Sequence, residues 1–120
     1  MNKKTLVLGA SLKSNRYSNY AIQRLLANKY EVVAFGLKKG SIDGVEIDTE
    51  LLPYKNIDTV TLYINAKRQS DYYNYVVSLS PKRVIFNPGT ENPKFYNILK
   101  ENNIAFEAAC TLVLLSTNQY

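Results

Sequence analysis

Short apolar runs alternate with segments of helical periodicity along most of the chain. The runs are rich in valine, isoleucine and leucine and most do not alternate with polar residues, which is typical of strands buried on both faces of a sheet. They predict five strands, at residues 5–8, 31–35, 59–64, 83–86 and 104–106. Between them, apolar residues at helical spacing predict helices over residues 18–29 and 66–79. A third helix is predicted to begin at Asn92-Pro93, an N-cap followed by proline at the first helical position.

Two parts of the sequence fit this alternation less well. Between residues 36 and 54, glycines and a proline interrupt the pattern, and the stretch SIDGVEI predicts a small hairpin or an edge strand around Asp43-Gly44. From Ala108 onward the tail is apolar enough to pack, but its pattern fits a helix and a strand equally. Ser18 is the expected N-cap of the first helix.

This order of elements predicts an α/β fold with a doubly wound, mostly parallel five-stranded sheet and helices on both faces. Right-handed crossovers favour the strand order 3-2-1-4-5. No internal repeat or linker divides the sequence, so residues 1–120 are expected to form a single domain. In such a sheet, ligands bind beyond the carboxyl ends of the strands, at the point where the strand order reverses. The predicted order places the loops after the first and fourth strands at that point.

The composition excludes several kinds of chemistry. The sequence has no histidine and one cysteine, which excludes a Ser-His-Asp triad, a phosphohistidine intermediate and a zinc site of imidazoles or thiolates within one chain. Cys110 can form no internal disulfide, which favours a reducing, cytoplasmic location. We expect Cys110 to be a small buried hydrophobic residue, with a mixed disulfide to a ligand thiol as the alternative. The longest apolar run, residues 112–115, is far too short to span a membrane.

Positive charge is concentrated in the first third of the chain. Residues 1–39 contain eight lysines and arginines and a single acid, Glu31, in a chain of net charge +5. Such a distribution favours an anionic partner. Nucleic acid would suit the charge, but neither a recognition helix nor a stacking sheet motif is visible, so a small phosphate-bearing molecule is the preferred partner.

The loop after the first predicted strand, GASLKSNRYS at residues 9–18, has the features of a phosphate site. Gly9 allows the backbone to turn sharply and to approach a ligand closely. Free amides at the start of the following helix carry partial positive charge, and Lys13 and Arg16 add full charges. Hydroxyl and amide donors are also present, at Ser11, Ser14, Asn15 and Ser18. The alternative is a solvent-exposed loop in which Gly9 only makes the turn.

Missing motifs narrow the kind of phosphate compound. The dinucleotide fingerprint G-x-G-x-x-G is not met, and a Walker loop is absent because no G-K-[ST] occurs. After the second strand, GLKKG at residues 36–40 stands where an NAD site would have an acid. The charge of Lys38 suits an extra phosphate on a ribose. The candidate ligand that remains is an adenine nucleotide that carries an additional phosphate.

Two further loops supply candidate ligand contacts. Asn65 ends the third predicted strand, and its side chain either faces the same cleft or simply terminates the strand. Asn87-Pro88-Gly89, in the stretch NPGTEN, borders the predicted switch point and is expected to touch the ligand, although it is also a good turn sequence. Glu91 is the only carboxylate of that loop, and one acid without a partner is weak evidence for acid–base catalysis.

These stretches together resemble the small single-domain CoA-binding proteins, which have a Rossmann-like fold and are relatives of the CoA-binding domain of the succinyl-CoA synthetase alpha subunit. The matching stretches are VLGAS at 7–11, R-x-S at 16–18, NPGTEN at 87–92 and EAAC at 107–110. They occur in the family's order over nearly the whole chain. The resemblance implies a CoA molecule along the carboxyl edge of the sheet, with its phosphates held by Gly9, Ala10, Ser11, Arg16 and Ser18. The valine-asparagine-proline-like stretch of the family is replaced here by Phe35-Gly36-Leu37-Lys38, which leaves the adenosine end unassigned.

We therefore predict a protein that binds coenzyme A or an acyl-CoA and performs no chemistry of its own. The alternative is an enzyme that uses NADP or another nucleotide and completes its site in a homodimer. NADP is the less favoured cofactor, because only one glycine of the dinucleotide fingerprint is present. Exposed tyrosines and the apolar tail would permit such a homodimer, and no metal site is predicted.

Overall fold

Seven strands form one sheet in the order β3-β4-β2-β1-β5-β6-β7 in the computed structural model, which describes residues 3–120. Neighbouring strands are parallel except β3 and β4, which form an antiparallel hairpin. The strands are β1 (Thr5–Ala10), β2 (Val32–Gly36), β3 (Gly40–Ile42), β4 (Val45–Asp48), β5 (Thr59–Leu62), β6 (Arg83–Phe86) and β7 (Ala105–Ala108). The helices are α1 (Tyr17–Ala27), the 3-10 helix η1 (Ala66–Tyr72), α2 (Tyr73–Leu79), α3 (Pro93–Glu101) and α4 (Thr111–Ser116).

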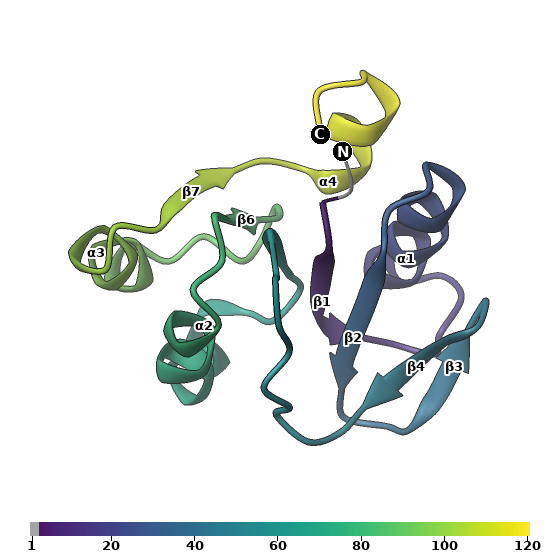
Figure 1. Ribbon diagram of the computed structural model, residues 1–120, viewed down its shortest axis with the longest axis horizontal. Helices are drawn as coiled ribbons and strands as arrows, with labels where there is room; N and C mark the ends of the chain where they lie inside the picture. The colour runs from purple at the N-terminus through teal and green to yellow at the C-terminus, as the bar shows by residue number, and fades with distance from the viewer. Residues whose placement is uncertain (1–2) are drawn as a thin grey trace.

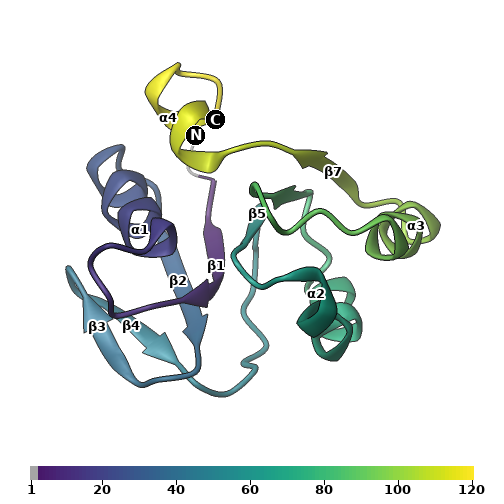
Figure 2. The ribbon, with the colours of Figure 1, turned by 180° about the vertical axis from the view of Figure 1, so that it is seen from behind.

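Helices cover both faces of the sheet, as the unbroken apolar strands predict (Figures 1 and 2). Alternate residues of the central strand β1 serve opposite faces. Leu6 and Leu8 belong to the core beneath α2 and α3, whereas Val7 belongs to the core beneath α1 and α4. All three side chains are completely buried. None of the helices within residues 3–120 has the length and apolar character needed to cross a membrane.

The predicted α/β class is confirmed, but the predicted sheet is wrong in strand number and order. The five expected strands all form, and in their own numbering they lie in the order 2-1-3-4-5 rather than 3-2-1-4-5. The stretch SIDGVEI forms the β3–β4 hairpin and supplies the two additional strands. Strand β4 pairs with β2 through Ala34 and Ile47, and Ile47 is buried. This pairing occupies the outer side of β2, so the next strand, β5, pairs with the other side of β1.

The observed strand order places the switch point elsewhere than the predicted order does. In a sheet of order 2-1-3-4-5 the reversal lies between the first and third strands, which here are β1 and β5. The loops that flank it follow β1 and β5, not β1 and β6 as the predicted order required. The loop that contains Asn65 therefore takes the position expected for the loop that contains Asn87.

Helix boundaries also differ from the prediction in two places. Helix α1 begins at Tyr17 with Arg16 as its N-cap, so Ser18 is not the cap but a buried residue of the first turn. The expected helix over 66–79 is divided into η1 and α2. At α3 the prediction is confirmed, because the Asn92 side chain accepts a hydrogen bond from the Phe95 amide and proline follows the cap.

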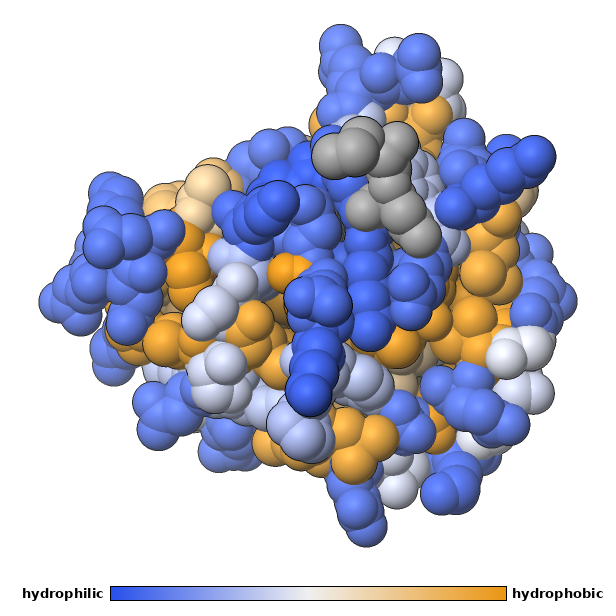
Figure 3. Space-filling model, in the orientation of Figure 1, coloured by the Kyte–Doolittle hydropathy of each residue, from blue (hydrophilic) through white to orange (hydrophobic). Residues whose placement is uncertain are grey.

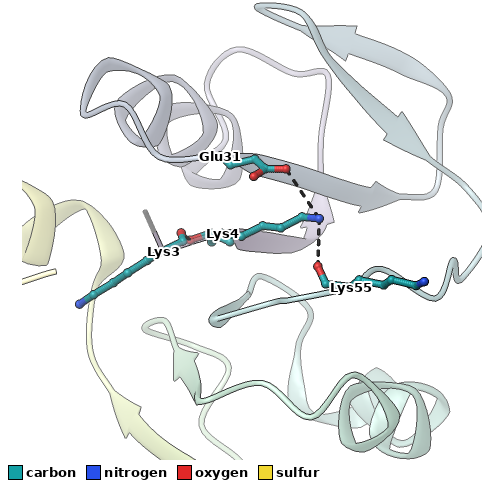
Figure 4. Close-up of polar contacts among 5 residues, drawn as sticks. Lys3, Lys4, Glu31 and Lys55 are labelled. Atoms are coloured by element: carbon teal, nitrogen blue, oxygen red, sulfur yellow. Dashed lines mark hydrogen bonds and ion pairs between the residues drawn. The ribbon is translucent and has the colours of Figure 1, made fainter. Parts of the chain in front are cut away.

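The amino edge of the sheet uses several cations for structural contacts. The Lys4 ammonium lies 3.6 Å from the Glu31 carboxylate and donates a hydrogen bond to the Lys55 carbonyl (Figure 4). Lys3 donates to the Tyr120 carbonyl, and the Arg83 guanidinium lies over the Tyr120 ring. Part of the positive charge of the first third is thus committed at this edge, away from the carboxyl ends of the strands. On the face shown in Figure 3, hydrophobic and hydrophilic residues are interspersed.

Candidate functional site

A cavity of about 680 Å³ lies at the carboxyl edge of the sheet, above the switch point between β1 and β5. Its walls come from the loop after β1, the start of α1, the loop after β2, and the segment that joins β5 to η1. The volume falls within the range of about 300–1,000 Å³ that is usual for small-molecule and cofactor sites.

Three separate loops bring most of the residues predicted from the sequence to this cavity. Those that line it are Gly9, Ala10, Ser11, Lys13, Arg16, Ser18, Lys38 and Asn65. The remaining lining residues are not among the ligand contacts predicted from the sequence; they are Leu12, Tyr17, Phe35, Gly36, Leu37, Tyr63, Ile64, Arg68 and Tyr72. Arg68 follows Asn65 by three positions, and the correct strand order would have pointed to it. Asn87, Pro88 and Gly89 are absent from the lining.

Gly9 allows the loop after β1 to touch the end of β5. Its φ angle is +105°, and a Cβ atom at this position would lie 2.9 Å from Ile64 Cγ1 and 3.0 Å from the Tyr63 carbonyl carbon. Any larger residue would therefore be strained and would push the two loops apart. The close approach joins the two sides of the switch point into one cavity.

The stretch GLKKG places Lys38 on the cavity wall. A Cβ atom at Gly36 would lie 2.4 Å from the Ala10 carbonyl oxygen, and one at Gly40 would lie 2.7 Å from the methyl carbons of Leu12. The two glycines thus seat both ends of their loop directly against the loop after β1. Lys38 lies between them and lines the cavity.

The amino terminus of α1 faces the cavity without a capping side chain. Arg16 has extended backbone angles, its side chain makes no capping hydrogen bond, and the first turn contains no acid. The Asn19 side chain donates a hydrogen bond to the Ser11 carbonyl at 3.0 Å and accepts one from the Gln23 side-chain amide at 2.6 Å. These two bonds hold the loop against the helix. The partial positive charge of the helix terminus is therefore open to an anion in the cavity.

Four cations line the cavity: Lys13, Arg16, Lys38 and Arg68. All four are exposed, and none forms an ion pair with another residue of the described chain. Neither aspartate nor glutamate contributes to the lining formed by residues 3–120. An excess of one sign of charge in a concave site raises the local concentration of ligands of the opposite sign.

The segment between β5 and α2 rests on a buried polar network. The Asn65 side chain accepts a hydrogen bond from the Arg68 amide at 3.2 Å and caps η1. Gln69 is completely buried and donates to the carbonyls of Ile64 and Thr90, both at 2.8 Å. The side-chain oxygen of Gln69 accepts a hydrogen bond from the side-chain amide of Asn92 at 2.9 Å. The loop NPGTEN therefore supports η1 from within the protein.

Asn87, which directly follows β6, has a structural role outside the cavity lining. Its side-chain amide is buried and donates to Thr61 Oγ1 and to the Leu62 carbonyl. Its side-chain oxygen accepts from the Thr111 amide at 2.9 Å, at the start of α4. Pro88 and Gly89 are exposed outside the cavity. The structure thus does not bring these three residues to the other candidate contacts, because β6 is not at the switch point.

Aromatic rings from β2, from η1 and from the residue that follows β5 contribute to the cavity wall. The rings of Phe35 and Tyr72 meet edge to face, with centroids 5.6 Å apart. Burial raises the pKa of the Tyr63 hydroxyl from its usual value near 10 to about 12. The neutral form of Tyr63 is therefore the one that the folded state favours.

This pKa shift predicts a loss of stability at alkaline pH. Below pH 10, Tyr63 is protonated in the folded and the unfolded chain, so its contribution is constant. As the pH rises from about 10 to about 12, the unfolded chain releases the proton first, and the free energy of unfolding falls. We expect Tyr63→Phe to lose less stability than the wild type between pH 9 and pH 11.5, measured by urea unfolding. An equal loss in both proteins would contradict this prediction.

Cys110 and a second hollow lie outside the cavity. Cys110 is half-buried, precedes α4 as its N-cap and does not belong to the lining. The second hollow, of about 460 Å³, lies between α1 and α4 and includes Tyr20, Arg24 and Asn28. Within residues 3–120, no three or more cysteine and acidic side chains are grouped so that they could hold a metal ion.

The fold is thus a doubly wound α/β fold with a cation-lined cavity at its switch point. The sequence matches the family model described as CoA binding domain over residues 3–116. The chain therefore belongs to this CoA-binding family, which confirms the resemblance inferred from its motifs.

Solved structures support the same fold. A protein whose crystal structure is described as that of an uncharacterized protein is 48% identical, with a TM-score of 0.97, and the match covers 100% of this chain and 99% of the other. A protein from Thermus thermophilus is 24% identical with a TM-score of 0.86, covering 99% and 91% of the two chains. A hypothetical protein from Pyrococcus horikoshii OT3 is 23% identical with a TM-score of 0.86, covering 98% and 84%. The last two show similarity of fold alone. No curated protein matches the sequence.

Proposed function

We propose that this protein binds coenzyme A, free or as an acyl-CoA, in the cavity between the loops after β1, β2 and β5, and that it acts as a binding protein rather than as an enzyme. The observation that carries the proposal is the four-cation lining without an acid at the uncapped start of α1. Membership of the CoA-binding family supports this choice of ligand.

The diphosphate of CoA is assigned to the start of α1. Backbone amides at a helix amino terminus bind phosphate oxygens without help from side chains. Gly9, Ala10 and Ser11 bring further backbone to the same wall, and Ser18 lies in the first turn. Lys13 and Arg16 supply full charges beside these amides. This arrangement suits two adjacent phosphate groups.

The ribose phosphate of CoA is assigned to Lys38. The glycines of GLKKG hold this lysine on the β2 side of the cavity, to one side of the α1 terminus. Leu37 is 67% exposed and lines the same wall, where it offers an apolar surface to the adenine. The uncharged pantetheine arm then runs toward β5, along Ile64 and the rings of Tyr63 and Tyr72. Asn65 offers a polar contact on that side.

Isothermal titration with CoA, dephospho-CoA, NADP and ATP tests the proposal. We expect CoA to bind with a dissociation constant well below a millimolar, the range in which the binding free energy is only about 4 kcal/mol. CoA should bind more tightly than dephospho-CoA, because only CoA carries the ribose phosphate. Failure of CoA to bind below about a millimolar would refute the proposal. Tighter binding of NADP than of CoA would favour the enzyme alternative.

Lys38→Gln is expected to raise the dissociation constant for CoA by about tenfold, in line with the loss of one charge-assisted hydrogen bond. The affinity for dephospho-CoA should hardly change, because this ligand lacks the phosphate that Lys38 is assigned to bind. Lys39→Gln is the matched control, since Lys39 is the neighbouring exposed lysine and does not line the cavity. An equal loss for both ligands, or an equal effect of both substitutions, would contradict the assignment.

A further inference from the structure

We propose that Arg68 binds the diphosphate from the β5 side, opposite the start of α1, and sets the affinity for this part of the ligand independently of the ribose phosphate. This inference rests on the proposed function. Neither the motifs in the sequence nor the match to the family model singles out this arginine.

The topology places Arg68 on the far side of the switch point from α1. Strand β1 leads into the loop and helix that hold Arg16, and β5 leads into η1, which holds Arg68. The contact of Gly9 with Tyr63 and Ile64 brings these two segments together. An anion at the start of α1 therefore lies in the same cavity that Arg68 lines.

The backbone of Arg68 is fixed although its side chain is exposed. The Asn65 side chain accepts a hydrogen bond from the Arg68 amide. The next residue, Gln69, is completely buried and anchored by hydrogen bonds to Ile64, Thr90 and Asn92. A fixed base lowers the conformational entropy that an arginine loses when it binds a ligand. Lys67, on the other side of Arg68 in η1, is exposed but does not line the cavity.

The order of the strands selects the diphosphate as the partner of Arg68. Lys38 follows β2 and Arg68 precedes α2 after β5, so the two cations lie on opposite sides of β1. A CoA molecule laid across this edge has its ribose phosphate on the β2 side and its uncharged pantetheine arm on the β5 side. The diphosphate above β1 is then the anionic group nearest to η1. A guanidinium group suits it, because its planar fork can donate two parallel hydrogen bonds to phosphate oxygens.

Titrations of CoA and dephospho-CoA into Arg68→Gln test this inference. We expect the dissociation constants for both ligands to rise by about tenfold, so that their ratio stays at the wild-type value. Lys67→Gln, which removes the neighbouring charge from the same helix, should leave both affinities near those of the wild type. Arg68→Lys should keep the charge but lose the two-pronged geometry, and should fall between wild type and Arg68→Gln. Thermal unfolding of Arg68→Gln should match the wild type, which separates a ligand contact from a structural role.

Three results would overturn the inference. Unchanged affinities in Arg68→Gln would show that Arg68 does not touch the ligand. A loss for CoA alone would assign Arg68 to the ribose phosphate. An equal loss in Lys67→Gln would reduce the effect to general charge. In each of these cases the wild type still binds CoA and the proposed function stands, whereas absence of wild-type binding would overturn both.

Discussion

Replacing Gly9 by alanine is expected to lower the free energy of unfolding by about 2–5 kcal/mol, the sum of backbone strain and steric overlap. The strain arises because Gly9 has a φ angle of +105°, which L-residues rarely adopt. The overlap arises because the new methyl group would meet Ile64 and the Tyr63 backbone at 2.9–3.0 Å. Urea unfolding monitored by circular dichroism measures the loss.

Gly89→Ala is a matched control for this substitution. Gly89 has a similar φ angle of +93°, but a Cβ atom there would have no neighbour within 4 Å. In Gly89→Ala the free energy of unfolding should therefore fall only by the backbone strain, about 1–2 kcal/mol. The difference between the two variants measures how closely the loops after β1 and β5 approach. Equal losses would contradict the close approach that forms the cavity.

Reversing the charge of Arg16 is expected to lower the affinity for CoA by about a hundredfold, because Arg16→Glu removes a charge-assisted contact and adds repulsion of phosphate. Arg16 is the N-cap of α1 and lines the cavity, where no acid opposes it among the described residues. The new carboxylate would also compete with phosphate for the free amides of the first turn. Titration calorimetry at fixed ionic strength measures the effect.

Arg24→Glu changes the net charge by the same amount on the same helix and serves as the control. Arg24 lies in the last turn of α1, in the hollow shared with α4. We expect CoA affinity to remain within about threefold of the wild type, since a surface charge beyond the Debye length of about 8–10 Å is largely screened. A similar loss in both variants would mean that CoA responds to overall charge rather than to the start of α1.

The sequence predicts the class of fold well because that class follows from local patterns. Unbroken apolar runs such as Val84 to Phe86 require burial on both faces, and the Asn92 side chain caps the helix that begins at Pro93. Strand order is a different kind of information. It depends on which edge of β2 the β3–β4 hairpin occupies, and nothing in SIDGVEI itself specifies the partner of Ile47.

The same distinction divides the candidate site. Gly9 and Arg16 are predictable because their loop follows the first strand, which borders the switch point in either strand order. The prediction that Asn87 contacts the ligand depends on the wrong order, and in the structure its amide instead joins β5, β6 and α4. The sequence does not predict Arg68 as a ligand contact for the corresponding reason, since its loop borders the switch point only when β5 lies beside β1.

The most direct test of the central claim is to map the CoA contacts by amide chemical shifts of the nitrogen-15-labelled protein during titration with CoA. We expect the largest changes within residues 9–18, 36–38 and 63–68, the segments that contain most of the cavity lining, while Asn87 to Gly89 and the end of α1 change little. Changes confined to the hollow between α1 and α4, or to residues 87–89, with residues 9–18 unaffected, would contradict it.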